Sequence, residues 1–235
     1  MPDSLRDRVY HANMTLAASG LVTGTFGNVS GADPDAGVML IKPSGVPYES
    51  LTAGDLVPVS LKTGAVLDGT LRPSSDTPTH LELYRAFGCG GVVHTHSTFA
   101  TAFAQARRAI RCLGTTHADY FRGDVPVTRT LTPAETESEY ERNTGVVIVE
   151  TFHTLGLSPR DISAVLVANH GPFVWADDAG RAVELAGVLE YLAQVNLATH
   201  QLADADTAPD RHLVEKHYLR KHGAGAYYGQ AGPRT

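Results

Sequence analysis

The segment GGVVHTHS at residues 90–97 is the feature that most constrains how this chain can fold. Val92 and Val93 favour an extended strand, and side chains alternate between the two faces of a strand, so His94 and His96 point the same way. Two residues of rise separate them by roughly 6–7 Å at the backbone, which suits two imidazoles converging on one metal ion. The pattern therefore predicts a sheet strand that presents a candidate metal site, although a lone His-x-His pair is a modest signal.

The composition is that of an ordinary globular protein. Hydrophobic residues make up 43% of the 235 positions and charged residues 19%, which is enough apolar material for a core. The net charge is −6 and there is no basic stripe, which argues against a nucleic-acid partner. No apolar run reaches the roughly 18–20 residues of a membrane span, and the N-terminus lacks the apolar stretch of a signal peptide. We therefore expect a cytoplasmic protein without a membrane or nucleic-acid partner.

Strand and helix patterns alternate along the chain, and several strands are joined by hairpins. This order predicts an α/β layered fold with a mixed or mainly antiparallel sheet, in a single domain over residues 1–235. Residues 132–156 are predicted to be mainly helical, with a break at Asn143-Thr144-Gly145, because asparagine and glycine together favour one.

His170 and Asp76 extend the candidate metal site. His170 stands where the apolar strand predicted at 162–171 breaks into a turn, and Asp76 begins a predicted helix just before the His94 strand. Three imidazoles are a common catalytic zinc set that leaves one position for water or substrate. The Asp76 carboxylate could add an oxygen ligand. The alternative for each histidine taken singly is a polar residue at the end of an element.

Three short polar stretches offer hydrogen-bond donors for an anion. Ser74 and Ser75 precede the helix that begins near Asp76, and helix N-termini attract phosphate through free N–H groups and positive potential. The alternative is that Ser75 and Asp76 only cap that helix. The three stretches are Ser74-Ser75, Gly27-Asn28, and Ser44-Gly45 beside Lys42.

Two further residues are candidates for proton transfer. Asp119 lies on the loop TTHADYFRGD, with few basic residues next to it in the sequence. A partly desolvated carboxylate near a metal can act as a general base. Tyr228, in the C-terminal tail, could act as a phenolic acid.

These motifs combine into a family pattern. The chain resembles the class II aldolase and adducin family from about residue 5 to residue 230. The segments SSDTPTH, GTTHADY and AYYGQ favour the sugar-phosphate 4-epimerases of that family over its aldolases. The resemblance is carried by GNVS at 27–30, IKPSGV at 41–46, KTG at 62–64, PSSDTPTH at 73–80, VHTHS at 93–97, GTTHADYF at 114–121, TGVVIVETF at 144–152, HGPF at 170–173 and HYLRKHGAGAYYGQ at 217–230.

The resemblance implies a three-layer αβα fold with a central, mainly antiparallel sheet, and a homotetramer whose sites are shared between subunits. It implies one zinc ion (Zn2+) per subunit, with the ligands Asp76, His94, His96 and His170. The residues implied to bind the substrate, chiefly its phosphate, are Gly27, Asn28, Ser44, Gly45, Ser74 and Ser75. The implied proton donor and acceptor are Asp119 and Tyr228, supported by Thr115 and His217. One departure from the family is Asn169, where a serine is expected.

The implied activity interconverts L-ribulose 5-phosphate and D-xylulose 5-phosphate by breaking and remaking the bond between carbons 3 and 4. Arabinose use is the common setting of this activity, and the sequence does not name the pathway. An aldolase of the same family, which releases the two fragments, is the nearest alternative. A non-catalytic adducin-like interaction domain is a third, and the complete set of ligand positions argues against it.

Overall fold

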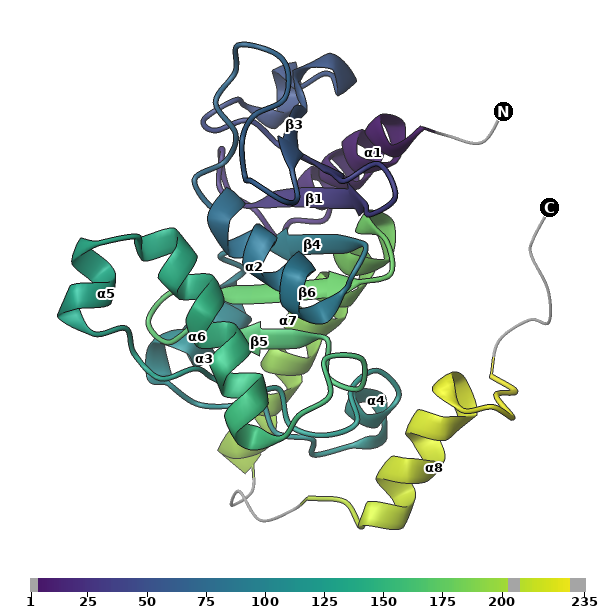
Figure 1. The fold of residues 1–235 in the computed structure, drawn as a ribbon. Helices are drawn as coiled ribbons and strands as arrows, with labels where there is room; N and C mark the ends of the chain where they lie inside the picture. The colour runs from purple at the N-terminus through teal and green to yellow at the C-terminus, as the bar shows by residue number, and fades with distance from the viewer. Residues whose placement is uncertain (1–3, 203–207, 229–235) are drawn as a thin grey trace.

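A six-stranded sheet with the strand order β3-β2-β1-β4-β6-β5 forms the centre of the computed structural model, which describes residues 4–202 and 208–228 (Figure 1). Every pair of neighbouring strands in this sheet is antiparallel. The predicted α/β fold with a mainly antiparallel sheet is therefore confirmed. The strands are β1 (Asn28–Asp33), β2 (Val38–Ile41), β3 (Val57–Ser60), β4 (Gly91–His94), β5 (Ala164–Leu166) and β6 (Pro172–Ala176).

Helices flank the sheet. They are α1 (Leu5–Ala18), α2 (Thr77–Phe87), α3 (Thr98–Ala106), α4 (Thr115–Ala118), α5 (Pro133–Glu137), α6 (Tyr140–Leu155), α7 (Ala179–Leu202) and α8 (Arg211–His222), with short 3-10 turns at Tyr48–Ser50 and Ala53–Asp55. Figure 1 shows α2 and α6 in front of the sheet, α7 behind it, and α8 beside α4. Within residues 4–202 and 208–228, no helix is long and apolar enough to cross a membrane.

Alternating side chains of the central strands divide the core into two layers. Val93 and Val174 face α1, α3 and α7, and they belong to one cluster of buried side chains. Val92 and Phe173 point the other way, into a second cluster shared with α2 and α6. His94 is two residues beyond Val92, so its side chain lies on the α2 and α6 side, where it stacks on Phe173 with 4.2 Å between ring centres. The three-layer αβα arrangement is thus present.

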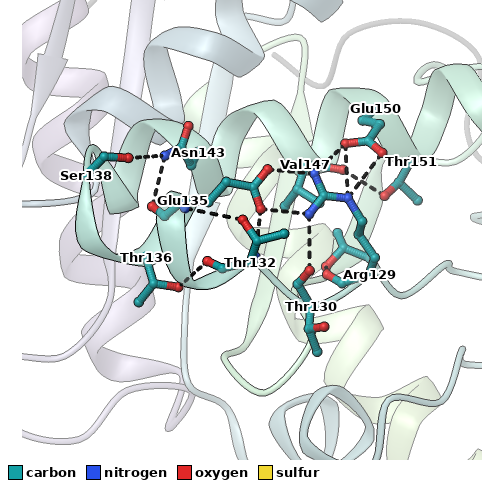
Figure 2. Close-up of polar contacts among 11 residues, drawn as sticks. Arg129, Thr130, Thr132, Glu135, Thr136, Ser138, Asn143, Val147, Glu150 and Thr151 are labelled. Carbon is teal, nitrogen blue, oxygen red and sulfur yellow. Dashed lines mark hydrogen bonds and ion pairs between the residues drawn. The ribbon is translucent and has the colours of Figure 1, made fainter.

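The predicted helix break at Asn143-Thr144-Gly145 is wrong. The chain breaks earlier, between α5 and α6 at Ser138, where φ is −98° and ψ is −109°. Asn143 lies inside α6, and its side-chain amide donates to the carbonyl oxygen of Glu135 and to the hydroxyl of Ser138 (Figure 2). Gly145 also lies inside α6, at a point where α6 packs against α2 too closely for a side chain. The asparagine therefore supports the turn before the helix instead of ending it.

Arg129 stabilises the connection between α5 and α6. The Arg129 guanidinium donates to both carboxylate oxygens of Glu135, each at 2.8 Å, and reaches the Glu150 carboxylate at 2.8 Å (Figure 2). Glu135 also closes a capping box with Thr132 at the start of α5. Charge-assisted bidentate contacts of this kind fix geometry as well as adding energy. The network holds the chain segment that leads into Tyr140, the first residue of α6.

Replacing Gly145 with alanine should destabilise the protein, although alanine normally stabilises a helix interior by about 0.5–1 kcal/mol relative to glycine. An added Cβ would lie 2.7 Å from Cβ of Glu82 and 3.2 Å from Cα of Thr79 on α2. Overpacking of this kind costs about 1–3 kcal/mol, which exceeds the gain in helix propensity. Urea unfolding should show the loss. Gly187→Ala in α7, where nothing lies within 4 Å of the added Cβ, is the matched control and should stabilise.

Candidate functional site

Three histidines converge at one end of the sheet. His94 is the last residue of β4, His96 follows two residues later, and His170 lies in the turn between β5 and β6. One ring nitrogen from each lies within 4.8 Å of the others, and the Nε2 atoms of His94 and His96 are 3.1 Å apart. The common orientation predicted for His94 and His96 is therefore present, and the third predicted imidazole lies beside them.

The turn between β5 and β6 explains how His170 reaches the cluster. The N–H of Val167 donates to the carbonyl oxygen of Gly171, and the N–H of His170 donates to the carbonyl oxygen of Val167. Asn169 has a φ of 62°, a left-handed conformation that asparagine adopts more readily than most residues. A Cβ on Gly171 would lie 2.7 Å from the carbonyl oxygen of Thr95. Asparagine at position 169, where the family resemblance suggested serine, thus suits this tight turn.

Hydrogen bonds orient two of the imidazoles, and burial lowers the pKa of His96 and His170. Nδ1 of His94 donates to the carbonyl oxygen of Pro172 at 2.9 Å, which leaves Nε2 free to face the cluster. The hydroxyl of Tyr140 lies 3.4 Å from Nδ1 of His170. Burial lowers the pKa of His170 to about 4, helped by the charges of His94 and His96, and burial also lowers the pKa of His96. Neutral imidazoles are the form that binds metal, so this donor set fits a divalent cation such as zinc.

Asp76 faces the same space and does not cap its helix. It occupies the N-cap position of α2 but makes no side-chain capping bond. Its carboxylate instead accepts a hydrogen bond of 2.7 Å from the side-chain amide of Asn28. Burial alone would raise the pKa of Asp76, but electrostatic interactions with His94 and His80 and the hydrogen bond from Asn28 lower it below its usual value. Asp76 lies outside the 4.8 Å group of histidines, and its role as a fourth ligand stays a prediction.

A cavity of about 400 Å³ opens beside the histidines. Six separate segments supply its wall: the start of β1, the turn after β2, the start of α2, the end of β4, the start of α6 and the β5–β6 turn. The side-chain oxygen of Asn28 is buried there and has no hydrogen-bond partner within the described residues, as expected of a group that receives a ligand. The wall includes all ten residues predicted to bind metal or substrate, namely Gly27, Asn28, Ser44, Gly45, Ser74, Ser75, Asp76, His94, His96 and His170.

Asp119 and Tyr228 lie elsewhere in the chain, and neither lines this cavity. Asp119 follows α4, and its carboxylate accepts hydrogen bonds from Arg220 on α8 at 2.7 and 2.9 Å. His217 and Lys221 of the same helix lie 3.1 and 3.9 Å from that carboxylate. The sequence around Asp119 is poor in basic residues, yet the fold surrounds it with three of them. Tyr228 is exposed and lies near the same helix.

Most of the chain matches one known protein family. A profile of the class II aldolase and adducin N-terminal domain matches residues 7–197. The chain belongs to the class II aldolase and adducin family. The three histidines of this family member are consistent with a divalent metal site, so the family and the site together indicate a metal-dependent enzyme.

Similar solved structures agree with this fold. An L-fuculose 1-phosphate aldolase is 25% identical with a TM-score of 0.75, covering 92% of this chain and 97% of its own. The L-fuculose-1-phosphate aldolase of Thermus thermophilus is 27% identical with a TM-score of 0.66, covering 87% and 98%. YgbL of Klebsiella pneumoniae, assigned only provisionally as an aldolase, epimerase or decarboxylase, is 27% identical with a TM-score of 0.68, covering 90% and 96%.

The cavity of this family member also contains Lys42, which the sequence placed beside a donor turn, and three residues that sequence reasoning missed, Phe26, Tyr140 and Glu141. Lys42 is 2% exposed, its ammonium donates to the carbonyl oxygen of Val46 at 2.6 Å, and burial lowers its pKa. Tyr140 and Glu141 line the wall from the start of α6, and Phe26 lies in the wall with its side chain exposed. The misplaced helix break hid Tyr140 and Glu141, since they looked like interior helix residues. The side chain of Asn143, which can cap an upstream turn, was the available signal.

Proposed function

We propose that this protein is a zinc-dependent L-ribulose-5-phosphate 4-epimerase. The observation that carries the proposal is one cavity wall that joins the three histidines to Asp76 and to three turns rich in small hydrogen-bond donors. A metal site beside an anion site suits a substrate that has adjacent oxygens at one end and a phosphate at the other. The segments SSDTPTH, GTTHADY and AYYGQ favour the epimerase within the family.

The chemistry explains why a 4-epimerase needs an aldolase-like site. The hydrogen on carbon 4 of a ketose phosphate is not acidic, so direct deprotonation there is hard. Cleaving the bond between carbons 3 and 4 avoids that step and gives a three-carbon fragment and glycolaldehyde phosphate. A bound zinc ion would supply Lewis acidity for the oxygens of the three-carbon fragment. Rebonding to the other face of the aldehyde inverts carbon 4 and gives D-xylulose 5-phosphate.

The turns that carry small hydrogen-bond donors would hold the phosphate of glycolaldehyde phosphate while its aldehyde group rotates. Ser74 and Ser75 precede α2, whose first N–H groups carry positive potential. Ser44 and Gly45 form a turn on the same wall, and Lys42 lies beside them as a buried cation. Holding the phosphate keeps glycolaldehyde phosphate in the site between cleavage and rebonding. An aldolase releases both fragments, so retention of the aldehyde between the two steps is required only for epimerisation.

Asp119 and Tyr228 would transfer protons on opposite faces of the aldehyde, one for each epimer. Because neither residue lines the cavity of its own chain, we propose that they act in the site of a neighbouring subunit of a homotetramer. The prediction is that mixing two inactive variants, His94→Ala and Asp119→Asn, restores part of the activity. In mixed tetramers some sites combine intact histidines from one subunit with an intact Asp119 from another. Activity that stays absent after subunit exchange, verified by native mass spectrometry, would contradict shared sites.

The second candidate function is a sugar-phosphate aldolase, favoured by the two L-fuculose 1-phosphate aldolases among the similar structures. A side-by-side assay separates the two. Zinc-loaded protein is incubated with L-ribulose 5-phosphate and, separately, with L-fuculose 1-phosphate, and free dihydroxyacetone and dihydroxyacetone phosphate are quantified. We expect epimerisation of the pentulose phosphate with little free dihydroxyacetone. Rapid release of either three-carbon product would instead identify an aldolase.

A further inference from the structure

One residue of α8 makes the main contacts to both candidate proton-transfer groups. Nε of Arg220 donates to one oxygen of the Asp119 carboxylate at 2.9 Å, and an Nη atom donates to the other at 2.7 Å. The two residues are 101 positions apart in sequence, and the Asp119 side chain is 10% exposed. Such a bidentate contact fixes both the position and the plane of a carboxylate.

Arg220 also fixes the segment that carries Tyr228. Its carbonyl oxygen accepts hydrogen bonds from the backbone N–H groups of Tyr227 and Tyr228, at 3.0 and 3.1 Å. Its guanidinium lies 4.7 Å from the centre of the Tyr228 ring, and the ammonium of Lys221 lies 4.5 Å from the same centre. Arg220 thus contacts one candidate group through its side chain and the other through both side chain and backbone.

We propose that Arg220 is a positioning residue that orients the Asp119 carboxylate and holds the segment of Tyr228, so that the acid and the base are both attached to α8 of one chain before the site is completed. The inference rests on the proposed function for its catalytic consequence. The contacts themselves do not depend on it. His217 and Lys221 support the same carboxylate from the same helix, but each makes a single contact with it.

The charge of Arg220 has a second consequence for Asp119. Burial alone would raise the pKa of Asp119, but the hydrogen bonds from Arg220 and His217 and the charge of Lys221 hold it below its usual value. The groups that act on this carboxyl, His217, Arg220 and Lys221, all belong to α8. Removing the guanidinium should therefore raise the pKa of Asp119 and move the acidic limb of the activity profile to higher pH.

Arg220→Gln tests the proposal, with Arg122→Gln as the matched control. Arg122 also attaches α8, through Glu215 at 2.7 Å, and pairs with Asp161, but it does not contact Asp119. We expect Arg220→Gln to lower kcat on the order of 10²-fold, with KM and zinc content little changed. Its acidic limb should move to higher pH, while Arg122→Gln keeps the wild-type profile. Arg220→Lys keeps a positive charge but cannot make the bidentate contact with the carboxylate. Compared with Arg220→Gln, it should therefore bring the pH profile back toward wild type more than it raises kcat.

The titration of Asp119 can be measured without catalysis, so the role of Arg220 can be tested even if the proposed epimerase activity is wrong. Carboxyl ¹³C NMR, with the Asp119 signal assigned by its loss in Asp119→Asn, follows the titration of this group directly. A higher titration midpoint in Arg220→Gln than in Arg122→Gln supports the positioning role, even if the wild-type protein does not epimerise. Equal midpoints in the two variants, or an identical loss of kcat in both, would overturn it and leave only a docking role for α8.

Discussion

Replacing His94 with alanine is expected to remove the bound divalent metal and, with it, the activity. The Nε2 atom of His94 lies 3.1 Å from that of His96 and belongs to the cluster whose ligand atoms all fall within 4.8 Å. Loss of a ligand should weaken zinc binding by more than the roughly 10–100-fold that loss of an outer-shell partner costs. Metal analysis of dialysed protein, with a zinc titration, measures the effect.

Two further variants make this prediction specific. His94 is buried and stacks on Phe173, so its truncation also removes packing. His96→Ala tests the same ligand set at a side chain that is less buried than His94, and it should lose zinc with a smaller packing loss. His153→Ala, an exposed histidine on α6, is the control and should keep full metal content. Stoichiometric zinc in both His94→Ala and His96→Ala would show that zinc binds elsewhere.

Asp119→Asn is expected to reduce epimerisation by on the order of 10²–10⁴-fold while zinc content stays at the wild-type level. The amide keeps the size of the side chain but cannot accept a proton, and it loses the charge that pairs with Arg220. Asp161→Asn is a useful control, because Asp161 accepts from Tyr218 of α8 and pairs with Arg122 without contacting Asp119. Near-normal kcat in Asp119→Asn would exclude this residue as an acid/base group.

The same variant has a pH-dependent effect on stability. The pKa of Asp119 is lower in the folded protein than its usual value, so its carboxylate stabilises the fold above the unfolded pKa of about 4. This contribution disappears as the pH falls through the lowered folded pKa. Asp119→Asn should therefore be less stable than wild type at neutral pH, with the difference shrinking from about pH 4 downward. A difference in urea midpoint that is constant with pH would contradict the charge-based explanation.

Features encoded in local sequence were the most predictable. The common orientation of His94 and His96 follows from the alternation of side chains on a strand, and the turn position of His170 follows from the end of an apolar run. The three donor turns could each be found, but the sequence could not show that they meet. That convergence depends on the order of the strands, in which β1 and β6 both pair with β4.

Features that depend on distant packing were missed. Tyr140 and Glu141 reach the cavity because they are the first two residues of α6, and the tight approach of Gly145 to α2 places the helix. The basic surroundings of Asp119 come from Arg220 and its neighbours, about a hundred residues away. Short-range periodicity contains no information about either contact, so these parts of the site required the three-dimensional structure.

The central claim is that the protein inverts carbon 4 by breaking and remaking a carbon–carbon bond at the histidine site. The most direct measurement is NMR of L-ribulose 5-phosphate incubated with zinc-loaded protein in D2O. We predict that D-xylulose 5-phosphate accumulates with its original hydrogen on carbon 4, because that carbon–hydrogen bond is never broken. Deuterium at carbon 4, free dihydroxyacetone as the main product, or no D-xylulose 5-phosphate at full zinc content would contradict the claim.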